Sequence, residues 1–292
     1  MEVVHLLVNR SAAAGRAARS VGAITAHLGT SGREVRVLAA ASKAEARAAA
    51  AVAVADGAGR IVVAGGDGLV HDVLPALVGS GTVLGVVPVG SGNDFARALG
   101  VVGLDVAEAC AVALGPARRF DAARSIAGGW VASIATAGFS GQVTARAAGL
   151  RFPPGRARYT TATLIELPRL WRRWWRIVVD GEVHEVEAVL VAVANTAFFG
   201  GGMAICPGAD PADGQLDVGV VGGVGRAQLM RFFPLVFSGA HVDHPAFETY
   251  RGAKVRLEAP EGVEVWADGE PFGAVPLELE AVPGALLVAA AT

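Results

Sequence analysis

The sequence is poor in several residue types, and each shortage narrows what the chain can be. Its 292 residues include two cysteines and only two lysines, Lys43 and Lys254. Two cysteines are too few for a disulfide framework, so Cys110 and Cys206 are most simply interpreted as buried thiols in a reducing compartment. A Walker phosphate loop needs a lysine directly after glycine, and neither lysine has one before it. The chain therefore has no Walker loop.

The chain also carries little net charge and no uninterrupted long apolar run. Its 25 basic and 27 acidic residues leave a formal net charge of −2, which argues against a surface made for nucleic acid. Glu2 and the lack of early basic residues argue against a signal peptide. The longest uncharged run, residues 188–209, contains Asn195, three consecutive glycines and Pro207. It therefore predicts a core strand and a loop in a cytoplasmic protein, not a membrane span.

A buried strand that runs directly into a glycine turn is the most informative segment. Residues 61–64 are apolar, residues 65–68 read Gly-Gly-Asp-Gly, and an apolar-periodic segment follows. This order predicts a phosphate-binding turn, because glycine lets the backbone approach an anion and the helix directs its first N–H groups toward it. Asp67 lies among amides that would bind phosphate, so its carboxylate suits a divalent cation or a proton. The alternative is a tight turn in which Asp67 caps the helix.

A second loop of the same kind follows the next predicted strand. Residues 82–89 are apolar and lead into Gly90-Ser91-Gly92-Asn93-Asp94. Ser91 offers a hydroxyl, Gly92 a permissive backbone, and Asn93 or Asp94 a helix cap. In an open α/β sheet, ligands bind outside the carboxyl ends of the strands. We therefore expect the two glycine loops to line one crevice.

The distribution of predicted strands divides the chain near residue 122. Before this point, strand-like runs alternate with alanine-rich helical stretches, which is the pattern of parallel βαβ units. After it, short strand candidates follow one another and favour an antiparallel sandwich or partial barrel. They lie at residues 130–136, 176–179, 183–194, 216–221, 254–258, 263–267 and 277–281. The predicted fold class is α/β plus all-β.

One segment, residues 146–176, is strongly basic. It contains eight arginines against a single acid, Glu166, which gives +7 within a chain of net −2. Trp171, Trp174 and Trp175 lie in the same segment. Arginine with tryptophan is typical of a membrane interface, where each basic residue near an anionic surface gains about 1 kcal/mol. The alternatives are a solvated helix with its aromatic residues in the core, and binding to single-stranded nucleic acid.

Four motifs in order resemble the bacterial diacylglycerol kinase and lipid kinase family. They are GGDG at 65–68, PVGSGNDFARALG at 88–100, the segment 195–218 and the tetrapeptide 267–270, Ala-Asp-Gly-Glu. The resemblance implies a Rossmann-like domain of the NAD kinase and phosphofructokinase type over residues 1–122. It implies a β-sandwich domain that binds the lipid acceptor over residues 123–283, with a last strand at about 284–292 that returns to the first domain.

The resemblance also implies roles for particular residues. Glu270 would be the general base, and Asp67 and Asp121 would hold the catalytic metal. The nucleotide would be bound by Asn9, Gly65, Gly66, Asp67, Gly68, Leu69, Ser91, Gly92, Asn93 and Asp94.

A structural Mg²⁺ would lie at Asp210, Asp213 and Gln215, the last through its backbone carbonyl. Alternatives that stay open are a metal-free turn at this loop and a plain hairpin turn at residues 268–269. The pair His241 and His244 suits an exposed loop better than a transition-metal site.

The chain departs from the family pattern at several positions. Leu69 stands where threonine is usual, and residues 9–15 keep only part of an early Asn-Pro and Ser-Gly signature. His71-Asp72 replaces an Asn-Glu pair, and Ser140 stands where an aspartate is expected. These departures bear on nucleotide affinity and on recognition of the lipid headgroup.

The predicted function is an ATP-dependent lipid kinase that uses Mg²⁺. It would transfer the γ-phosphate to a lipid hydroxyl, diacylglycerol-like or sphingoid-like, at an anionic membrane surface, as a cytoplasmic and peripherally membrane-associated enzyme. The alternatives are a catalytically weak or inactive relative that binds nucleotide or lipid, and a kinase of the NAD kinase type with a soluble substrate. No nucleic-acid partner is expected, a homodimer stays open, and the sequence does not identify the lipid.

Overall fold

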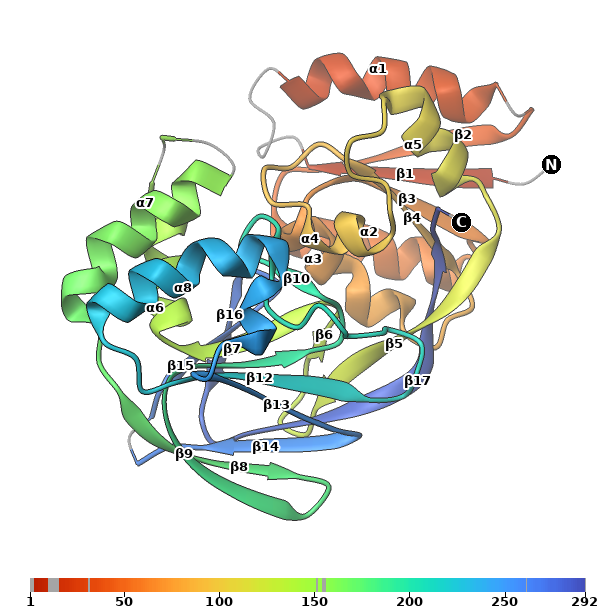
Figure 1. The fold of residues 1–292 in the computed structure, drawn as a ribbon. Coiled ribbons are helices and arrows are strands. Elements are labelled where there is room, and N and C mark those ends of the chain that lie inside the picture. The colour runs from red at the N-terminus through yellow and green to blue at the C-terminus, as the bar shows by residue number, and fades with distance from the viewer. Residues whose placement is uncertain are drawn as a thin grey trace. The chain divides into compact units, whose positions relative to one another are not determined.

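The computed structural model describes residues 3–9, 16–30, 32–150, 152–153, 156–260 and 262–291, with only the backbone at 16–19 and 156. The chain forms two compact units (Figure 1). Unit 1 contains Met1–Asp121 and Pro283–Thr292, and unit 2 contains Ala122–Val282. The early signature at residues 10–15 lies outside the described residues.

Unit 1 is built on a parallel sheet. The order of its strands is β2, β1, β3, β4 and the end of β17, and each neighbouring pair is parallel. Their bounds are β1 Val3–Asn9, β2 Glu34–Ala40, β3 Arg60–Gly65, β4 Val83–Pro88 and β17 Leu277–Ala289. The inner strands are apolar on both faces, with Leu6, Leu7 and Val62 fully buried, as a sheet covered on both sides requires.

In the described part of unit 1, five helices accompany this sheet. They are α1 Arg16–Gly29, α2 Lys43–Ala55, α3 Asp67–Leu77, α4 Asp94–Ala98 and α5 Val106–Ala113. Helices α1 and α5 pack together over one core, in which Ile24 and Ala109 meet Leu6 of β1. Helices α2 and α3 contact each other and the strands β1 and β3. Strand, helix and strand thus alternate as the sequence predicts.

Unit 2 is an antiparallel β-sheet structure with helices. Its main strand order is β16, β15, β7, β9, β8, β14 and the first half of β17, and β12 joins β9 to β13. The strands are β5 Ala117–Ser125, which begins in unit 1, and β6 Trp130–Val131, β7 Ile134–Gly138, β8 Arg173–Val179, β9 Glu182–Ala194, β10 Phe198–Phe199, β11 Met203–Ala204, β12 Leu216–Gly222, β13 Phe247–Gly252, β14 Lys254–Glu258, β15 Glu264–Ala267 and β16 Glu270–Ala274. The predicted combination of an α/β fold with a β-sandwich is confirmed.

In its described part, unit 2 also contains three helices in addition to the strands. They are α6 Phe139–Gly149, α7 Arg156–Glu166 and α8 Arg226–Ser238, with short 3₁₀ turns η1 Leu167–Arg169 and η2 Ala240–Asp243. Phe139, Ala162 and Phe232 of these helices share a core with Val189 of β9. Among the described residues, no helix is long and apolar enough to span a bilayer.

Two expectations about single segments have clear outcomes. Cys110 and Cys206 are buried free thiols, as predicted, and burial raises the pKa of the Cys110 thiol to about 11. The two predicted strands at 277–281 and about 284–292 are instead one strand, β17. It continues through Pro283 because Gly284 takes a φ of 61°, which glycine adopts without steric cost.

Candidate functional site

The two predicted glycine loops lie against each other at the carboxyl ends of β3 and β4. The Val89 N–H donates to the Gly65 carbonyl at 3.2 Å. A Cβ added to Gly90 would lie 2.6 Å from the Gly66 Cα, so the two backbones approach more closely than any side chain allows. Glycine at position 90 is thus a requirement of the packing between the loops, and a Cβ at Gly66 would lie a tight 3.2 Å from the Gly90 Cα.

Asp67 links the two loops through its side chain. One carboxylate oxygen, Oδ1, accepts the Phe95 N–H at 2.9 Å. The other, Oδ2, would be 2.8 Å from a Cβ at Gly92. Asn93 takes the left-handed conformation, with φ 58°, and its Nδ2 donates to the Gly90 carbonyl at 2.8 Å. The structure therefore brings Gly66, Asp67, Gly90, Gly92 and Asn93 together.

The remaining predicted nucleotide residues differ in exposure. Ser91 is exposed, whereas Asp94 is buried in the first turn of α4. Leu69 is only 6% exposed, and its side chain packs against Gly65. Asn9 is half-buried at the end of β1. Leu69 therefore supports the turn from within α3, and a hydroxyl at this position would be surrounded by the same apolar contacts.

Asp72, one of the departures from the family pattern, has a structural role. It is 3% exposed, and its Oδ1 accepts a hydrogen bond from Nε of Arg47, in α2, at 3.1 Å. Burial raises the pKa of the Asp72 carboxyl, and the Arg47 guanidinium opposes that shift. The pair ties α2 to α3, the helix that starts in the glycine turn.

Asp121 is buried near the end of unit 1. It is 2% exposed, and its Oδ1 accepts the Gly284 N–H at 2.7 Å. The carboxylate therefore holds the point at which β17 enters unit 1. Its part in binding a metal stays a prediction.

The predicted catalytic tetrapeptide forms a two-residue hairpin between β15 and β16. Asp268 and Gly269 both have positive φ, 52° and 84°, as in a type I′ turn. The Asp268 carboxylate accepts two backbone N–H groups, from Ala132 at 3.0 Å and Ser133 at 2.8 Å. Glu270, the first residue of β16, is half-buried beside this anchored turn. The hairpin alternative is thus correct as geometry, and it leaves Glu270 at a fixed place.

Asn195 supports the same corner from the other side. It is 1% exposed, its Nδ2 donates to the Ala132 carbonyl at 2.9 Å, and its N–H donates to the Ser133 carbonyl at 2.8 Å. In the described part of the chain, the buried hydroxyls of Ser133 and Thr196 have no hydrogen-bond partner. Buried hydroxyls normally have partners, so this corner suits water or a ligand hydroxyl. Sequence reasoning missed it, and the only signal was polar residues inside apolar runs.

An apolar cavity lies among the helices of unit 2. Its volume is about 50 Å³, and its walls come chiefly from α6, α7, α8 and β9. Phe139, Val143, Met203 and Phe232 are among the lining residues. Ser140, which stands where the family has an aspartate, also lines it and is 4% exposed. A carboxylate there would be buried beside hydrocarbon, so serine suits this environment better.

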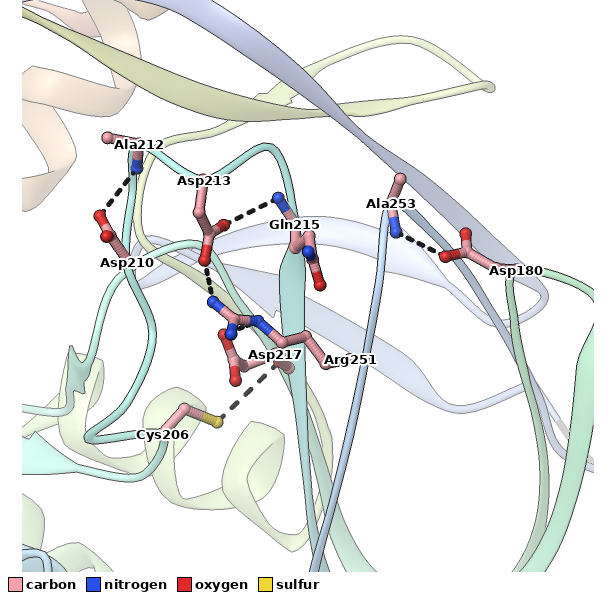
Figure 2. A network of polar contacts seen from close by, with 9 residues as sticks. All are labelled: Asp180, Cys206, Asp210, Ala212, Asp213, Gln215, Asp217, Arg251 and Ala253. Atoms are coloured by element: carbon pink, nitrogen blue, oxygen red, sulfur yellow. Dashed lines mark hydrogen bonds and ion pairs between the residues drawn. The ribbon is translucent and has the colours of Figure 1, made fainter.

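The predicted metal loop is held by its own backbone and by an arginine (Figure 2). Asp210 Oδ1 accepts the Ala212 N–H at 3.0 Å, and Asp213 Oδ1 accepts the Gln215 N–H at 2.9 Å. The second Asp213 oxygen forms an ion pair with Arg251. No group of three metal-ligating side chains occurs in the described ranges. As arranged, the side chains of this loop do not fit a divalent cation, because a guanidinium holds the Asp213 carboxylate.

The basic segment at 146–176 is divided between surface and core. Trp175 is 1% exposed, Trp174 is 62% exposed, and the guanidinium of Arg173 stacks over the Trp171 ring at 3.9 Å. Ion pairs are described for four of its arginines, and two of the partners, Glu187 and Glu258, lie outside the segment. The pairs are Arg146 and Arg169 with Glu166, Arg172 with Glu187, and Arg176 with Glu258. The surface charge of the segment is therefore smaller than its sequence indicates. Arg151 lies outside the described residues, as does the side chain of Arg156.

The expectation that His241 lies in an exposed loop was wrong. Its side chain is fully buried in η2, where Nε2 lies 2.9 Å from the Ile205 carbonyl and the ring contacts Phe232 and Phe247. Burial lowers the pKa of His241 from its ordinary value. His241 is thus a core residue.

Comparison with known proteins covers both units. Residues 3–125 match the diacylglycerol kinase catalytic domain, and residues 133–290 match the YegS C-terminal NAD kinase beta sandwich-like domain. A diacylglycerol kinase of Mycobacterium tuberculosis is 36% identical over 98% of this chain and 94% of that relative. A probable lipid kinase YegS-like protein of Pseudomonas aeruginosa is 32% identical over 88% of this chain and 85% of its own.

A solved structure shares the fold. The crystal structure of a diacylglycerol kinase from Bacillus anthracis aligns with a TM-score of 0.76. The alignment covers 99% of this chain and 97% of the other at 21% sequence identity. The path of the chain through both units is thus that of a known fold.

Proposed function

The chain belongs to the diacylglycerol kinase family of lipid kinases and is a phosphotransferase, and we propose that it transfers the γ-phosphate of ATP to a primary hydroxyl of a diacylglycerol-like or sphingoid-like lipid. The observation that carries the lipid part of the proposal is the apolar cavity of unit 2. A kinase for a soluble metabolite has no need of a cavity lined by Phe139, Val143, Met203 and Phe232. Hydrocarbon gains about 0.8 kcal/mol for each CH₂ that is buried.

The nucleotide is proposed to bind at the paired glycine loops. The close approach of Gly66 and Gly90 supports this, as does the start of the 11-residue helix α3 at Asp67. Phosphoryl transfer needs positioning and charge stabilisation, usually with Mg²⁺. Asp67 is the residue that would hold an Mg²⁺ brought by the nucleotide, because its Oδ2 faces the Gly92 backbone between the loops. The metal would offset the charge that develops on the phosphate.

Glu270 is proposed to take the proton from the acceptor hydroxyl. It follows a turn whose Asp268 carboxylate is bound to two backbone N–H groups, so the position of the next side chain along β16 is fixed. Glu270 belongs to unit 2, whereas Asp67, proposed to meet the nucleotide, belongs to unit 1. General-base catalysis of this kind is worth about 10²- to 10⁴-fold in rate.

The acceptor would be met at a membrane surface, to which the protein is proposed to attach peripherally from the cytoplasm. Phe152 is 79% exposed, Trp174 62% and Leu164 50%, all within or next to α7 and β8. Aromatic side chains beside arginine suit the headgroup region. Vesicle sedimentation tests this: Trp174→Ala should weaken binding to anionic vesicles several-fold, while Ile126→Ala, an equally exposed residue elsewhere, should not. Equal loss in both variants would contradict the proposed surface.

A transfer assay tests the proposal as a whole. Radiolabelled ATP and Mg²⁺ are incubated with the protein and mixed micelles that contain diacylglycerol, a sphingoid base or ceramide, and in parallel with NAD. We expect label in at least one lipid and none in NAD. Label in NAD alone would support the soluble-substrate alternative, and no transfer to any acceptor would support a binding protein that has lost turnover.

A further inference from the structure

The 210–217 loop of unit 2 places three carboxylates within eight residues, beside one arginine. Asp210, Asp213 and Asp217 lie in this segment, and Arg251 lies on the neighbouring strand β13 (Figure 2). Arg251 pairs with Asp213, and its Nε lies 3.7 Å from Asp217 Oδ2. The guanidinium therefore bridges the loop and the strand that follows it.

The sheet fixes this bridge through its register. Arg251 on β13 stands directly opposite Asp217 on β12 in the antiparallel pair. The arginine side chain thus starts at a place set by backbone hydrogen bonds and reaches the loop from there. Cross-strand pairs of opposite charge are a normal stabilising element of a sheet. Here Arg251 also pairs with Asp213, which lies in the loop outside the two strands.

The carboxylate oxygens are otherwise used within the loop. Asp210 and Asp213 each accept a backbone N–H two residues ahead, at 3.0 and 2.9 Å. Such turns order a loop without a metal. A divalent cation at Asp213 would have to displace the guanidinium or share the carboxylate with it, and like charges at such distances repel.

We propose that Arg251 is the built-in counter-ion of this loop and takes the place of a structural divalent cation there. The loop is then ordered in the absence of metal, and the metal requirement of the enzyme arises only from the nucleotide. This inference does not depend on the identity of the lipid or on Glu270, so it can fail or hold independently of the proposed function.

The test removes the positive charge of Arg251 and measures whether magnesium then changes the melting temperature of the protein. The variants are Arg251→Met and, as matched control, Arg256→Met, which breaks the ion pairs of Arg256 with Glu258 on its own strand and with Glu278 on β17. Thermal unfolding of each protein is followed by circular dichroism without nucleotide, in EDTA and in millimolar magnesium chloride. For wild type and for Arg256→Met, the melting temperature of each protein should be the same in EDTA as in magnesium chloride. Arg251→Met should melt about 2–4 °C below wild type in EDTA and recover in magnesium.

A second measurement decides the matter if Arg251→Met does not fold. Magnesium chloride is titrated into wild type and into Asp213→Asn without nucleotide, and the heat is recorded. We expect no binding that depends on Asp213. Stoichiometric magnesium binding to wild type that Asp213→Asn abolishes would overturn the proposal. A folded Arg251→Met protein that shows no magnesium response beyond that of the control would overturn it as well.

Discussion

Two turns of this molecule, one in each unit, present an aspartate beside glycine, and the two carboxylates are used differently. Asp67 in the turn after β3 has one oxygen on the Phe95 N–H and the other beside Gly92. Asp268 in the β15–β16 hairpin has both oxygens on backbone N–H groups, from Ala132 and Ser133. A carboxylate with both oxygens occupied holds the backbone in place. The hairpin carboxylate therefore supports the backbone, and the roles proposed for Asp67 and Glu270 are what the following variants test.

The largest effect should come from Glu270→Gln. The amide keeps the shape of the side chain but does not take up a proton, so turnover should fall by about 10²- to 10⁴-fold. Nucleotide affinity, measured by calorimetry, and the melting temperature should stay at wild-type values. Asp67→Asn should instead weaken binding of ATP with Mg²⁺. Loss of nucleotide affinity in Glu270→Gln would show that the two turns do not have separate tasks.

The next effect should come from Asp268→Ala. Two buried N–H groups lose a charged acceptor, and each such bond is worth about 1.5–3 kcal/mol. The free energy of unfolding, measured in urea, should drop by about 3 kcal/mol or more, and Asp268→Asn should recover part of it. Turnover should fall in both because Glu270 is no longer held. An Asp268→Ala protein of normal stability would mean that the carboxylate does not hold the hairpin.

A smaller effect is expected where the glycine loops touch. Gly90→Val places a branched side chain 2.6 Å from the Gly66 Cα, and forced overpacking costs about 1–3 kcal/mol. Nucleotide affinity should fall by roughly 10- to 100-fold. Gly59→Val is a fitting control, because Gly59, like Gly90, has no positive φ, and a Cβ added to it meets nothing within 4 Å. Equal nucleotide affinity in wild type and Gly90→Val would show that nucleotide binding does not depend on the close contact between the two loops.

The smallest effect lies away from both turns and serves as a control. Burial lowers the pKa of His241 below its ordinary value of 6.5, so the unfolded chain takes up a proton at higher pH than the folded one. Stability should therefore fall as the pH drops below about 6.5, until the folded pKa is reached. In His241→Phe, the fall in melting temperature with falling pH that His241 causes should be absent. A variant with an unchanged pH profile would remove His241 as the cause.

What the sequence could predict depends on how local each feature is. The strand, glycine turn and helix at residues 61–77 were readable because neighbouring residues specify them, and the family resemblance that rested on these turns is confirmed. Helix α8 was missed because its apolar positions surround Pro234 and its packing partners lie in distant helices. The charge on residues 146–176 was misjudged because Glu187 and Glu258 neutralise part of it from outside.

If a lipid chain enters the apolar cavity during phosphoryl transfer, as proposed, a variant that fills the cavity should discriminate against long acyl chains more than wild type does. Val143→Phe enlarges a side chain that lines the cavity. The measurement is kcat/KM for diacylglycerols of increasing acyl length in the same micelles, expressed as the ratio of wild type to variant. We expect this ratio to rise with chain length, by up to about fourfold for each CH₂ that only the wild type can bury. A ratio independent of chain length would contradict the claim.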